Sequence, residues 1–386
     1  MKKKDVSIFG STGSIGVNTL SVIADNLSNF NIIALIANEN YKLLASQARK
    51  FRPKYIVIKN SSYYSKIKDE LSDIQNITIL HGDNAVSQTA LIKCDLFISA
   101  IVGVDGLLPT YNAICSGSNI ALANKESIIC AGNFMLDLAR KKNVKIIPID
   151  SEHNAIFQLL NNKVSDINNV TITASGGPFF NKDINFKNIT VKQAVKHPIW
   201  SMGKKISVDS ATMVNKALEV IEAYYLFSLK IEQIKVIIHP QSIIHGILNY
   251  KDGSSHSVMS FPDMKIPISY CLTYPERQYI YHQELNLAKI SKLEFYEIDE
   301  NKYQAIKLCK ATLEIGGNMP IIFNMANEIA VKYFLGEMIT FDKIINIIND
   351  SINTIKYCNF SNIDNIIDYC QDVKRQIIPI ANKYHN

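Results

Sequence analysis

Short apolar runs alternate with helix-like segments through the first 150 residues of the chain. Strands are expected at residues 5–10, 31–37, 55–58, 96–101, 119–123 and 145–149. A helical pattern, such as that of residues 41–51, lies between consecutive strands. Strands that alternate with helices in this way form right-handed βαβ units around a parallel sheet. The pattern therefore predicts an α/β domain with a doubly wound, Rossmann-like parallel sheet over residues 1–150.

The pattern changes after residue 150. A strand expected at 170–174 is followed by a glycine-rich turn, and strands expected at 243–250 and 255–261 flank Asp252-Gly253. This dipeptide favours a type I′ hairpin, so we expect a two-stranded antiparallel ribbon. We predict a central α+β domain over 151–274 with a flexible lid near 196–204, then a linker over 275–299. A C-terminal helical domain is expected over 300–386, with a break between helices at 316–320.

Composition indicates a soluble globular protein. Of the 386 residues, 47% are hydrophobic and 20% are charged, so two or three domains are expected. The net charge of +6 comes from dispersed basic residues and suits an anionic small substrate as well as nucleic acid.

The seven cysteines form no Cys-x-x-Cys pair, which indicates a reducing cytoplasm. We expect no signal peptide and no membrane-spanning segment, because no apolar run has the required length.

An acidic triplet, Asp150-Ser151-Glu152, follows the last apolar run of the first domain. Pro148 restricts that run to an edge strand or a strand end. Ligands of open α/β sheets bind at the carboxyl ends of the strands, where the two carboxylates project. Two such charges about 4 Å apart repel each other by roughly 4 kcal/mol at an effective dielectric constant near 20. They therefore need a shared proton, a basic neighbour or a divalent cation. Taken alone, the triplet fits a solvated helix N-terminus equally well.

A glycine loop, in which Gly10, Gly13 and Gly16 are spaced three residues apart, follows the first strand. Glycines at a strand-to-helix turn allow close backbone approach to a dinucleotide pyrophosphate, and the helix N-terminus supplies N–H donors. Thr12 and Ser14 add hydroxyl donors, and a tight turn without a ligand is the alternative. Asn38-Glu39-Asn40 follows the second strand, where an acid usually marks NAD.

Lys125 lies in Asn124-Lys125-Glu126, which closes another apolar run at the same edge of the predicted sheet. There it is placed to meet an anionic substrate or the carboxylates of the acidic triplet. A surface Lys–Glu pair is the alternative.

A helix predicted from about Ala211 places Asn215, Lys216 and Glu219 on one face, because they are three and four residues apart. Asp209 or Ser210 is expected to cap this helix. An amide, an amine and an acid beside a serine suit a phosphate and a metal ion together. A solvated helix face is the alternative.

Two loops of the central domain carry further candidates. Ser175-Gly176-Gly177, directly after a strand, is a possible anion-binding loop. His197 and Trp200, the only tryptophan of the chain, lie in a loop bounded by proline and glycine. This loop fits a lid over a ligand and also an aromatic side chain packed onto the domain surface.

Seven segments of the chain carry the signatures of one enzyme family. They are Gly10-Ser-Thr-Gly-Ser-Ile-Gly16, Ala123-Asn-Lys-Glu-Ser127, Asp150-Ser-Glu-His-Asn-Ala-Ile-Phe157, Ser175-Gly-Gly-Pro-Phe179, His197-Pro-Ile-Trp-Ser-Met-Gly203, Lys205-Ile-Ser-Val-Asp-Ser-Ala-Thr212 and His239-Pro-Gln-Ser242. In this order they resemble the 1-deoxy-D-xylulose 5-phosphate reductoisomerase family over nearly the whole chain.

The resemblance implies a homodimeric, cytoplasmic enzyme of non-mevalonate isoprenoid biosynthesis. Family members convert 1-deoxy-D-xylulose 5-phosphate to 2-C-methyl-D-erythritol 4-phosphate with NADPH and Mg²⁺ or Mn²⁺. The reaction is a retro-aldol and aldol rearrangement followed by hydride transfer. A divalent cation stabilises the enolate charge, and the hydride belongs to the cofactor. By this resemblance the central domain would be the catalytic and dimerisation domain.

Carried over residue by residue, the resemblance implies a metal site of Asp150, Glu152 and Glu219, whose oxygens suit Mg²⁺ or Mn²⁺. These three residues and Lys125 would be catalytic. The substrate would contact Lys125, Ser151, Glu152, Ser175, His197, Trp200, Met202, Ser210, Asn215, Lys216 and Glu219, with Ser175, Ser210, Asn215 and Lys216 on its phosphate. NADPH would contact Gly10, Thr12, Gly13, Ser14, Ile15, Asn38, Glu39, Asn40, Asn124, Glu126 and Gly203.

The sequence departs from the family at Glu39. The family often has a Gly-Lys-Asn-like string there, whose lysine suits the adenosine 2′-phosphate, whereas Glu39 repels it. We retain NADPH as the expected cofactor, with a weaker preference over NADH. The expected partner is a phosphorylated ketose, with no nucleic acid and no membrane. The rival interpretations are a metal-dependent NAD(P) dehydrogenase of a polyol phosphate, without rearrangement, and a non-enzymatic nucleotide-sensing protein.

Overall fold

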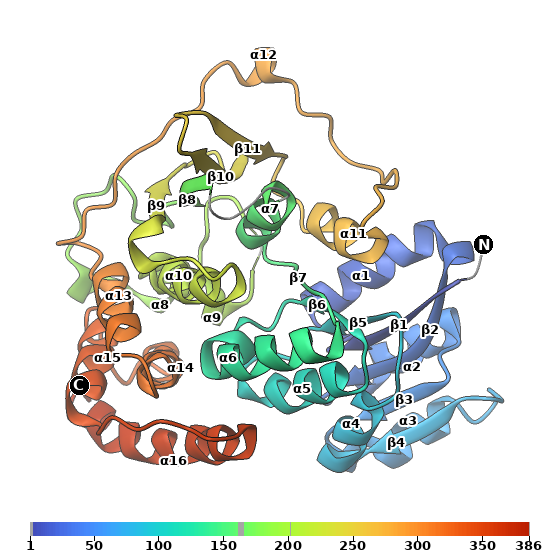
Figure 1. Cartoon of the computed structure of the whole chain (residues 1–386). Helices are drawn as coiled ribbons and strands as arrows, with labels where there is room; N and C mark the ends of the chain where they lie inside the picture. Colours follow the sequence, from blue (N-terminus) through green and yellow to red (C-terminus); the bar gives the residue numbers. More distant parts are fainter. Residues whose placement is uncertain (1–2, 161–165, 201, 386) are drawn as a thin grey trace. The chain divides into compact units, whose positions relative to one another are not determined.

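The structure is a computed structural model that describes residues 3–160, 166–200 and 202–385 (Figure 1). Ser201 of the predicted lid lies outside the described residues. The chain forms two compact units. The first comprises residues 1–127, 133–154 and 263–282, and the second comprises residues 128–132, 155–262 and 283–386.

The first unit is built on a seven-stranded sheet in the order β4-β3-β2-β1-β5-β6-β7 (Figure 1). Its strands are β1 (Lys4–Phe9), β2 (Phe30–Ala37), β3 (Tyr55–Ile58), β4 (Thr78–His81), β5 (Leu96–Ser99), β6 (Asn119–Leu122) and β7 (Ile146–Pro148). All neighbouring pairs are parallel, so the predicted doubly wound parallel sheet is confirmed. Pro148 lies in an edge strand, as expected. The sequence pattern missed β4, because this edge strand buries no side chain fully.

Helices connect these strands. They are α1 (Ser14–Asp25), α2 (Tyr41–Phe51), α3 (Tyr64–Glu70), α4 (Gly82–Ala90), α5 (Leu107–Cys115) and α6 (Lys125–Lys142), with short 3-10 turns η1 (Leu27–Asn29), η2 (Ser61–Tyr63) and η3 (Val104–Gly106). The chain proceeds in one direction from β1 to β4 and in the other from β5 to β7. Right-handed crossovers therefore place α1 to α3 on one face and α4 to α6 on the other. The order reverses between β1 and β5, which is where such sheets bind ligands. A later helix, α11 (Lys265–Thr273), packs against α1.

The turn from β1 into α1 depends on two glycines. Gly10 has a φ of +97°, and a Cβ atom there would lie 2.3 Å from the backbone oxygen of Ala100, which follows β5. A Cβ atom at Gly16 would lie 2.3 Å from the oxygen of Gly10. By contrast, a Cβ atom at Gly13 would have a single neighbour, the oxygen of Gly10 at 3.4 Å. The first and third glycines therefore let the helix and the β5 loop approach β1 closely.

The second unit contains a four-stranded sheet in the order β11-β10-β8-β9. Its strands are β8 (Ile167–Ala174), β9 (Ile234–Ile238), β10 (Ile244–Tyr250) and β11 (Ser255–Met259). The predicted hairpin is confirmed as β10–β11, but it is half of a mixed sheet, because β8 pairs with β10 antiparallel and with β9 parallel.

The predicted type I′ turn in this hairpin is wrong. Within the turn only Gly253 has a positive φ, of 89°, whereas a type I′ turn needs two such residues. Asp252 instead accepts a hydrogen bond from the backbone N–H of Ser254 at 2.9 Å. The aspartate side chain therefore stabilises a wider turn.

Helices make up most of the remaining chain. They are α7 (Ser151–Leu159), α8 (Val191–Ala194), α9 (Lys204–Ala211), α10 (Val214–Leu226), α12 (Leu287–Ile290), α13 (Ala305–Ile315), α14 (Met319–Leu335), α15 (Lys343–Thr354) and α16 (Ile363–Asn382), with η5 (Phe186–Asn188) and η6 (Ile231–Gln233). The helical C-terminal segment and its break are confirmed, because α13 ends before Gly316 and α14 has Pro320 in its first turn. Helix α10 packs against α13, and α14 packs against α15 and α16.

The motif His239-Pro-Gln-Ser242 binds the segment around Glu294 and Phe295, which precedes the C-terminal helices. His239 Nδ1 lies 2.8 Å from the backbone oxygen of Glu294, and Gln241 Nε2 donates to a carboxylate oxygen of Glu294 at 3.0 Å. The ring of Phe295 stacks on His239 with the centroids 4.7 Å apart. The backbone of Tyr296 pairs with that of Ile238 at the end of β9. This motif therefore has a structural role in the second unit.

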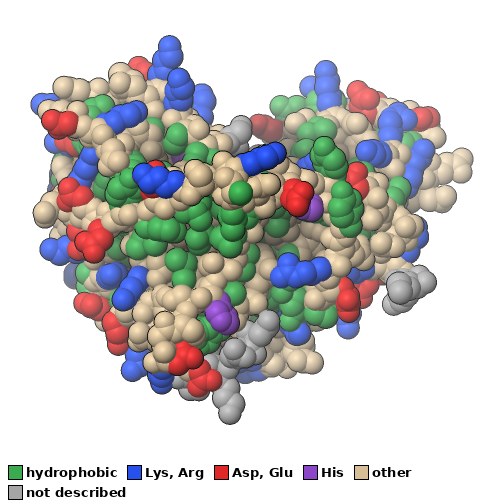
Figure 2. All heavy atoms as spheres, turned by 90° about the horizontal axis from the view of Figure 1, so that it is seen from above, with side chains coloured by type: hydrophobic (Ala, Val, Ile, Leu, Met, Phe, Trp, Pro, Cys, Tyr) green, Lys and Arg blue, Asp and Glu red, His purple; other side chains and the backbone are tan. Residues whose placement is uncertain are grey.

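Charged side chains of both signs are mixed on the face drawn in Figure 2. The mixture follows from the dispersed basic residues of the sequence. No helix of residues 3–160, 166–200 and 202–385 combines the length and the hydrophobicity needed to cross a membrane.

The glycine contacts predict a difference in stability between two matched variants. Gly16→Ala should lower the free energy of unfolding by about 1–3 kcal/mol or more, because its Cβ overlaps backbone that cannot move aside. Gly13→Ala should cost less than about 1 kcal/mol. Thermal unfolding followed by circular dichroism measures both. Equal losses in the two variants would show that the close approach at Gly16 is not needed.

Candidate active site

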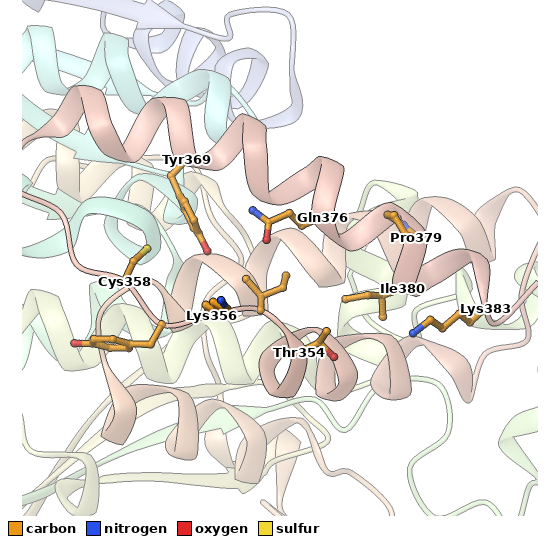
Figure 3. Close-up of a pocket in the computed structure, with 10 residues that line it drawn as sticks. Thr354, Lys356, Cys358, Tyr369, Gln376, Pro379, Ile380 and Lys383 are labelled. Carbon is orange, nitrogen blue, oxygen red and sulfur yellow. The ribbon is translucent and has the colours of Figure 1, made fainter.

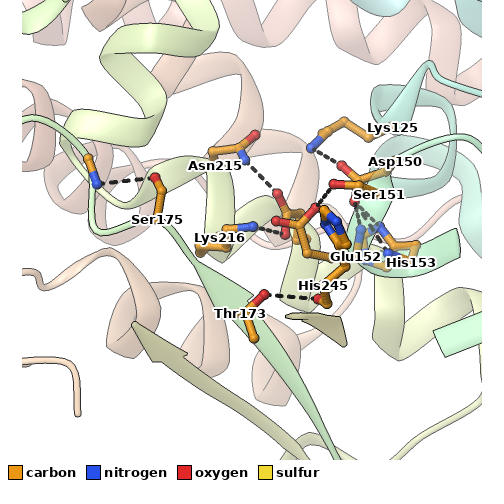
Figure 4. Close-up of polar contacts among 12 residues, drawn as sticks. Lys125, Asp150, Ser151, Glu152, His153, Thr173, Ser175, Asn215, Lys216 and His245 are labelled. Carbon is orange, nitrogen blue, oxygen red and sulfur yellow. Dashed lines mark hydrogen bonds and ion pairs between the residues drawn. The ribbon is translucent and has the colours of Figure 1, made fainter. Parts of the chain in front are cut away.

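Parallel strands bring several predicted residues to one edge of the first unit. The strands end at the same edge, so Asn124 after β6 and Asp150 after β7 lie on neighbouring loops. Lys125 begins α6, and its Nζ lies 3.2 Å from Asp150 Oδ2 (Figure 4). Both side chains are mostly buried, with 17% and 16% exposed. The alternative for Lys125, a surface Lys–Glu pair, is therefore not observed, because Lys125 is mostly buried and pairs with Asp150.

Asp150 both caps a helix and holds an amine. Its Oδ1 accepts hydrogen bonds from the backbone N–H groups of Glu152 at 3.2 Å and His153 at 3.4 Å, which are orphan donors at the start of α7. Its Oδ2 faces Lys125. The helix-capping and the cation-binding interpretations of the acidic triplet are therefore compatible, because they use different oxygens of one carboxylate.

The other members of the triplet lie beside Asp150. The Ser151 hydroxyl donates to Glu152 Oε2 at 2.5 Å (Figure 4). Sequence reasoning missed His153, which is fully buried with its Nδ1 3.1 Å from Asp150 Oδ1. Its position three residues after an aspartate at a helix start is the signal that could have found it.

Asn124 and Glu126, predicted as cofactor contacts, also support a loop. The side-chain amide of Asn124 donates to the backbone oxygens of Ile101 at 2.7 Å and Gly103 at 2.9 Å, and to Glu126 Oε2 at 2.9 Å. Its Oδ1 accepts from the backbone N–H of Ser127 as the N-cap of α6. Both side chains are buried. They fix the loop after β5, against which the glycine loop packs.

The glycine loop fits a dinucleotide pyrophosphate. Helix α1 begins at Ser14 after Gly13, and in the described structure no side chain caps it and no acid lies in its first turn. Its first N–H groups are thus available to an anion. Gly13 and Ser14 are exposed, and Thr12 and Ile15 are half-buried. Asn38, Glu39 and Asn40 are exposed after β2, although Asn40 also caps α2 through a bond from the Leu43 N–H at 3.2 Å.

In the second unit, the predicted start of the helix that carries Glu219 is wrong. Residues 204–211 form the separate helix α9, and α10 begins at Val214 after Met213, whose φ is +62°. Asp209 therefore does not cap α10. It is 1% exposed and accepts from Asn327 Nδ2 at 2.8 Å, while Lys205 Nζ lies 2.8 Å from its other oxygen. Ser210 likewise lies in the last turn of α9 rather than before α10.

Asn215, Lys216 and Glu219 form one hydrogen-bonded cluster on α10. Asn215 Nδ2 donates to Glu219 Oε1 at 2.5 Å, and Lys216 Nζ donates to Oε2 at 2.7 Å (Figure 4). Glu219 is 1% exposed and Lys216 is 7% exposed, so the solvated-face alternative is wrong. A buried carboxylate is tolerated only when its charge is matched, which Lys216 does here.

Ser175 and His197 meet at the glycine-rich turn after β8. His197 Nε2 lies 2.9 Å from Ser175 Oγ, and its Nδ1 accepts from the backbone N–H groups of Ile199 at 3.2 Å and Trp200 at 2.9 Å. Nδ1 is therefore the unprotonated nitrogen and Nε2 carries the hydrogen. Burial, with a smaller contribution from the charge of Lys216, lowers the pKa of His197 to about 4. The imidazole is a neutral donor at physiological pH.

Ser210 lies next to the same turn. A Cβ atom at Gly177 would be 2.9 Å from the backbone oxygen of Ser210, so the turn rests on the end of α9. Trp200 is half-buried, with its ring 6.5 Å from that of His245. Met202 is half-buried and Gly203 is the N-cap residue of α9. At one end of the predicted lid, His197 contacts the Ser175 turn, and at the other end Gly203 caps α9.

The predicted residues therefore gather within each unit. The first unit joins Lys125, Asp150, Ser151 and Glu152, which can bind a cation and polar groups of a ligand. The second unit joins Asn215, Lys216 and Glu219. It also places Ser175 beside His197, whose pKa is lowered in part by the charge of Lys216. Amines, hydroxyls and a neutral imidazole are suitable donors for a phosphate.

A separate hollow of about 720 Å³ lies between the end of α15 and α16 (Figure 3). It is lined by Thr354, Ile355, Lys356, Tyr357, Cys358, Tyr369, Gln376, Pro379, Ile380 and Lys383. None of these is a carboxylate or a predicted site residue, so this hollow is not a candidate for the metal-dependent chemistry.

Three family models match successive parts of the chain. The model of 1-deoxy-D-xylulose 5-phosphate reductoisomerase matches residues 6–132, and two models of its C-terminal domains match residues 146–227 and 259–376. Together they cover the glycine loop, the acidic triplet and the α10 cluster.

Full-length relatives and solved structures agree with these matches. The 1-deoxy-D-xylulose 5-phosphate reductoisomerase of Ehrlichia canis (strain Jake) is 46% identical over 379 residues, which is 97% of each chain. That of Wolbachia pipientis subsp. Culex pipiens (strain wPip) is 44% identical over 94% of each chain. The Zymomonas mobilis enzyme in complex with NADPH superposes with a TM-score of 0.93 at 36% identity, over 98% of this chain and 99% of that one. A reductoisomerase in complex with NADPH, fosmidomycin and magnesium gives 0.93 at 36% identity, over 98% of both. This chain belongs to the 1-deoxy-D-xylulose 5-phosphate reductoisomerase family.

Proposed function

We propose that this chain converts 1-deoxy-D-xylulose 5-phosphate to 2-C-methyl-D-erythritol 4-phosphate, with NADPH as reductant and Mg²⁺ or Mn²⁺ as the metal. The observation that carries the proposal is the match to reductoisomerases over 97% of the chain. Its relatives of known structure bind NADPH and magnesium. The residues that we propose for the reaction come from both units.

The proposed metal ligands are Asp150, Glu152 and Glu219. Their carboxylates supply the hard oxygens that Mg²⁺ and Mn²⁺ prefer. In the structure these oxygens face amine and hydroxyl donors of the chain, such as Lys125, Ser151 and Lys216. An amine beside Asp150 and another beside Glu219, and a hydroxyl donor beside Glu152, support three negatively charged carboxylates that would favour a cation. We therefore infer that one divalent cation binds all three carboxylates.

The proposed phosphate site is formed by Ser175, Ser210, Asn215 and Lys216, with His197 above it. Lys216 contributes the charge, and Asn215 and the serines contribute neutral donors. His197 donates from Nε2, because its Nδ1 is occupied by the N–H groups of residues 199 and 200. Trp200 and Met202 then belong to the segment that covers the substrate and excludes water.

The remaining roles follow from the chemistry of each group. A bound divalent cation supplies a Lewis acid for the negative charge that develops on the substrate oxygens, and NADPH supplies the hydride. Lys125 and Ser151 contact the hydroxyl and carbonyl groups of the ketose. Lys125 also keeps a positive charge beside Asp150. The protein thus contributes position and charge rather than a covalent intermediate.

All proposed cofactor contacts except Gly203, which belongs to the second unit, follow strands of the seven-stranded sheet at its carboxyl edge. The uncapped start of α1 binds the pyrophosphate, with Thr12, Gly13, Ser14 and Ile15 against it. Gly10, Asn38, Glu39, Asn40, Asn124, Glu126 and Gly203 complete the proposed set. Asn124 and Glu126 act mainly by holding the loop after β5.

We also propose that the enzyme is a cytoplasmic homodimer, as the family resemblance implies. All seven cysteines are free thiols, in keeping with a reducing compartment. β11 is an edge strand on which Ser255, His256, Ser257 and Met259 are exposed, and an uncovered edge suits self-association. Light scattering should give a mass near twice 43.4 kDa, and a mass of 43.4 kDa would contradict the dimer.

One assay separates the proposed activity from its rival, a dehydrogenase of a polyol phosphate. Purified protein is incubated with 1-deoxy-D-xylulose 5-phosphate, Mn²⁺ and NADPH while the NADPH absorbance is followed. Carbon-13 NMR of the product should show the branched carbon skeleton. Oxidation of NADPH with a linear product would favour the dehydrogenase, and no oxidation would refute both.

Removing one proposed metal ligand should abolish turnover. Glu219→Gln keeps the shape of the side chain but removes its charge, so we expect kcat/KM to fall by a factor on the order of 10³. Asp150→Asn should act similarly. Glu232→Gln, an exposed acid in η6, is the control and should retain full activity. Unchanged metal-dependent turnover in the first two variants would refute the ligand assignment.

Removing the phosphate amine should affect one substrate selectively. We expect Lys216→Ala to raise KM for 1-deoxy-D-xylulose 5-phosphate about 10- to 100-fold, because a charge-assisted hydrogen bond is lost. KM for NADPH should stay within about twofold. The control is Lys230→Ala, an exposed lysine just before η6. Equal increases in both KM values would count against a phosphate role.

His197 should make the stability depend on pH. Its pKa is lowered to about 4 from an ordinary value of 6.5, so between these values the unfolded chain binds a proton that the folded chain does not. Stability is therefore lost progressively as pH falls from about 6.5 towards 4, and His197 contributes no slope above that range. Urea unfolding at about pH 7.5 and about pH 5 should show a smaller drop in His197→Gln than in the parent. His256→Gln, at an exposed site on β11, is the control. Identical drops in all three proteins would contradict the neutral imidazole.

A further inference from the structure

The residue after β2 is unfavourable for NADPH. In dinucleotide-binding sheets this position faces the adenosine ribose, where an acid suits the 2′-hydroxyl of NAD and a cation suits the 2′-phosphate of NADP. Here the position holds Glu39, which is exposed. Its carboxylate repels a phosphate dianion. If the chain uses NADPH, as proposed above, another cation at this edge must balance the phosphate.

Lys59 follows β3, the neighbour of the strand that Glu39 follows. It is the first residue after β3, which pairs in parallel with β2 so that Ile58 is opposite Ala37. The backbone N–H of Lys59 donates to the oxygen of Ala37 at 2.8 Å, and that of Asn60 donates to Asn38 at 2.9 Å. Paired strands lie about 4.8 Å apart, so the Lys59 backbone starts one strand spacing from the segment that contains Glu39.

The Lys59 side chain reaches over the carboxyl edge of the sheet. Its Nζ pairs with Asp105 in η3, after β5, and lies 3.4 Å from Asp83 Oδ1 in the first turn of α4, after β4. β3 and β5 are separated in the sheet by β2 and β1. The amine therefore lies between the segments that follow β4 and β5. In the sheet order these two strands flank β3, β2 and β1, and the glycine loop and Glu39 follow β1 and β2.

The two aspartates hold this amine only weakly. The side chains of Asp83 and Asp105 are 85% and 65% exposed, whereas that of Lys59 is 25% exposed. Ion pairs with such exposed carboxylates are screened by water and contribute little to stability. A phosphate dianion carries more charge and more acceptor oxygens than either carboxylate. A phosphate at this place would compete with the two aspartates for the amine.

We infer that Lys59 binds the adenosine 2′-phosphate of NADPH in this chain, in place of a cation after β2. The inference rests on the proposed use of NADPH. Glu39 then opposes Lys59, lowers the preference for NADPH and leaves measurable binding of NADH through the ribose hydroxyls. Lys59 thus determines specificity for the cofactor and takes no part in the chemistry.

Equilibrium binding to the full-length protein tests this inference. NADPH and NADH are titrated separately by calorimetry without the ketose. We expect Lys59→Ala to raise Kd for NADPH at least about tenfold, through the loss of a charge-assisted hydrogen bond, with Kd for NADH within about twofold. Lys54→Ala, an exposed lysine at the opposite end of β3, should change neither constant. Glu39→Gln should lower Kd for NADPH several-fold.

Three results would overturn the inference. One is equal weakening of NADPH and NADH by Lys59→Ala, since Lys59 would then support the loop rather than the phosphate. Another is a higher Kd for NADPH in Lys42→Ala, a variant in the first turn of α2, together with an unchanged Kd in Lys59→Ala. The third is an equal dependence of both cofactors on salt, because the extra contact of NADPH is ionic. Lys59→Arg keeps the charge and should retain NADPH binding, which guards against a folding defect.

The binding readout also separates this inference from the proposed function. A protein that binds NADPH through Lys59 but does not convert the ketose would refute only the function. A protein that performs the conversion while Lys59→Ala binds NADPH normally would refute only the inference.

Discussion

The candidate site depends on one constraint, which is that a carboxylate removed from water needs a charge or several donors to balance it. Glu219 is 1% exposed and is held by Asn215 and Lys216 one turn earlier on the same helix. Asp150 is held by Lys125 and by the N–H groups at the start of α7. Isolated carboxylates at such positions would take up protons or destabilise the fold. The amines that make these acids tolerable are the groups that we propose to bind the substrate.

The proposed roles would let the same residues serve folding and function. A divalent cation held by these carboxylates would neutralise them in place of Lys125 and Lys216. The two amines would then be able to bind the phosphate and hydroxyl groups of the ketose, and the local charge would stay balanced. His197 fits the same logic, because the backbone N–H groups of Ile199 and Trp200 hold it neutral and leave Nε2 as a donor.

Much of the fold could be predicted from the sequence because local patterns determine it. The parallel sheet follows from alternating apolar runs and helices, and the edge position of β7 follows from Pro148. The α10 cluster follows from the spacing of three residues on one helix. These features need only neighbours in the sequence, and the structure has them as expected.

Sequence reasoning was incomplete where partners distant in the sequence decide the outcome. The sequence suggests Asp209 as a helix cap, but its buried carboxylate accepts a hydrogen bond from Asn327, 118 residues later. Asn124 stays a predicted cofactor contact, and its amide also donates to the backbone oxygens of Ile101 and Gly103, which the sequence does not indicate. The position of Glu39 after β2 favours NAD, and only the pairing of β2 with β3 shows that Lys59 follows the neighbouring strand. None of these partners has a signature in the local sequence.

The central claim is that Asp150, Glu152 and Glu219 bind one divalent cation. Its most direct test is a crystal structure of the protein with Mn²⁺, with diffraction recorded on both sides of the manganese absorption edge. The account predicts a single anomalous peak in each chain, within coordination distance of oxygens from all three carboxylates. A peak bound by other residues, or no peak at saturating Mn²⁺, would contradict it.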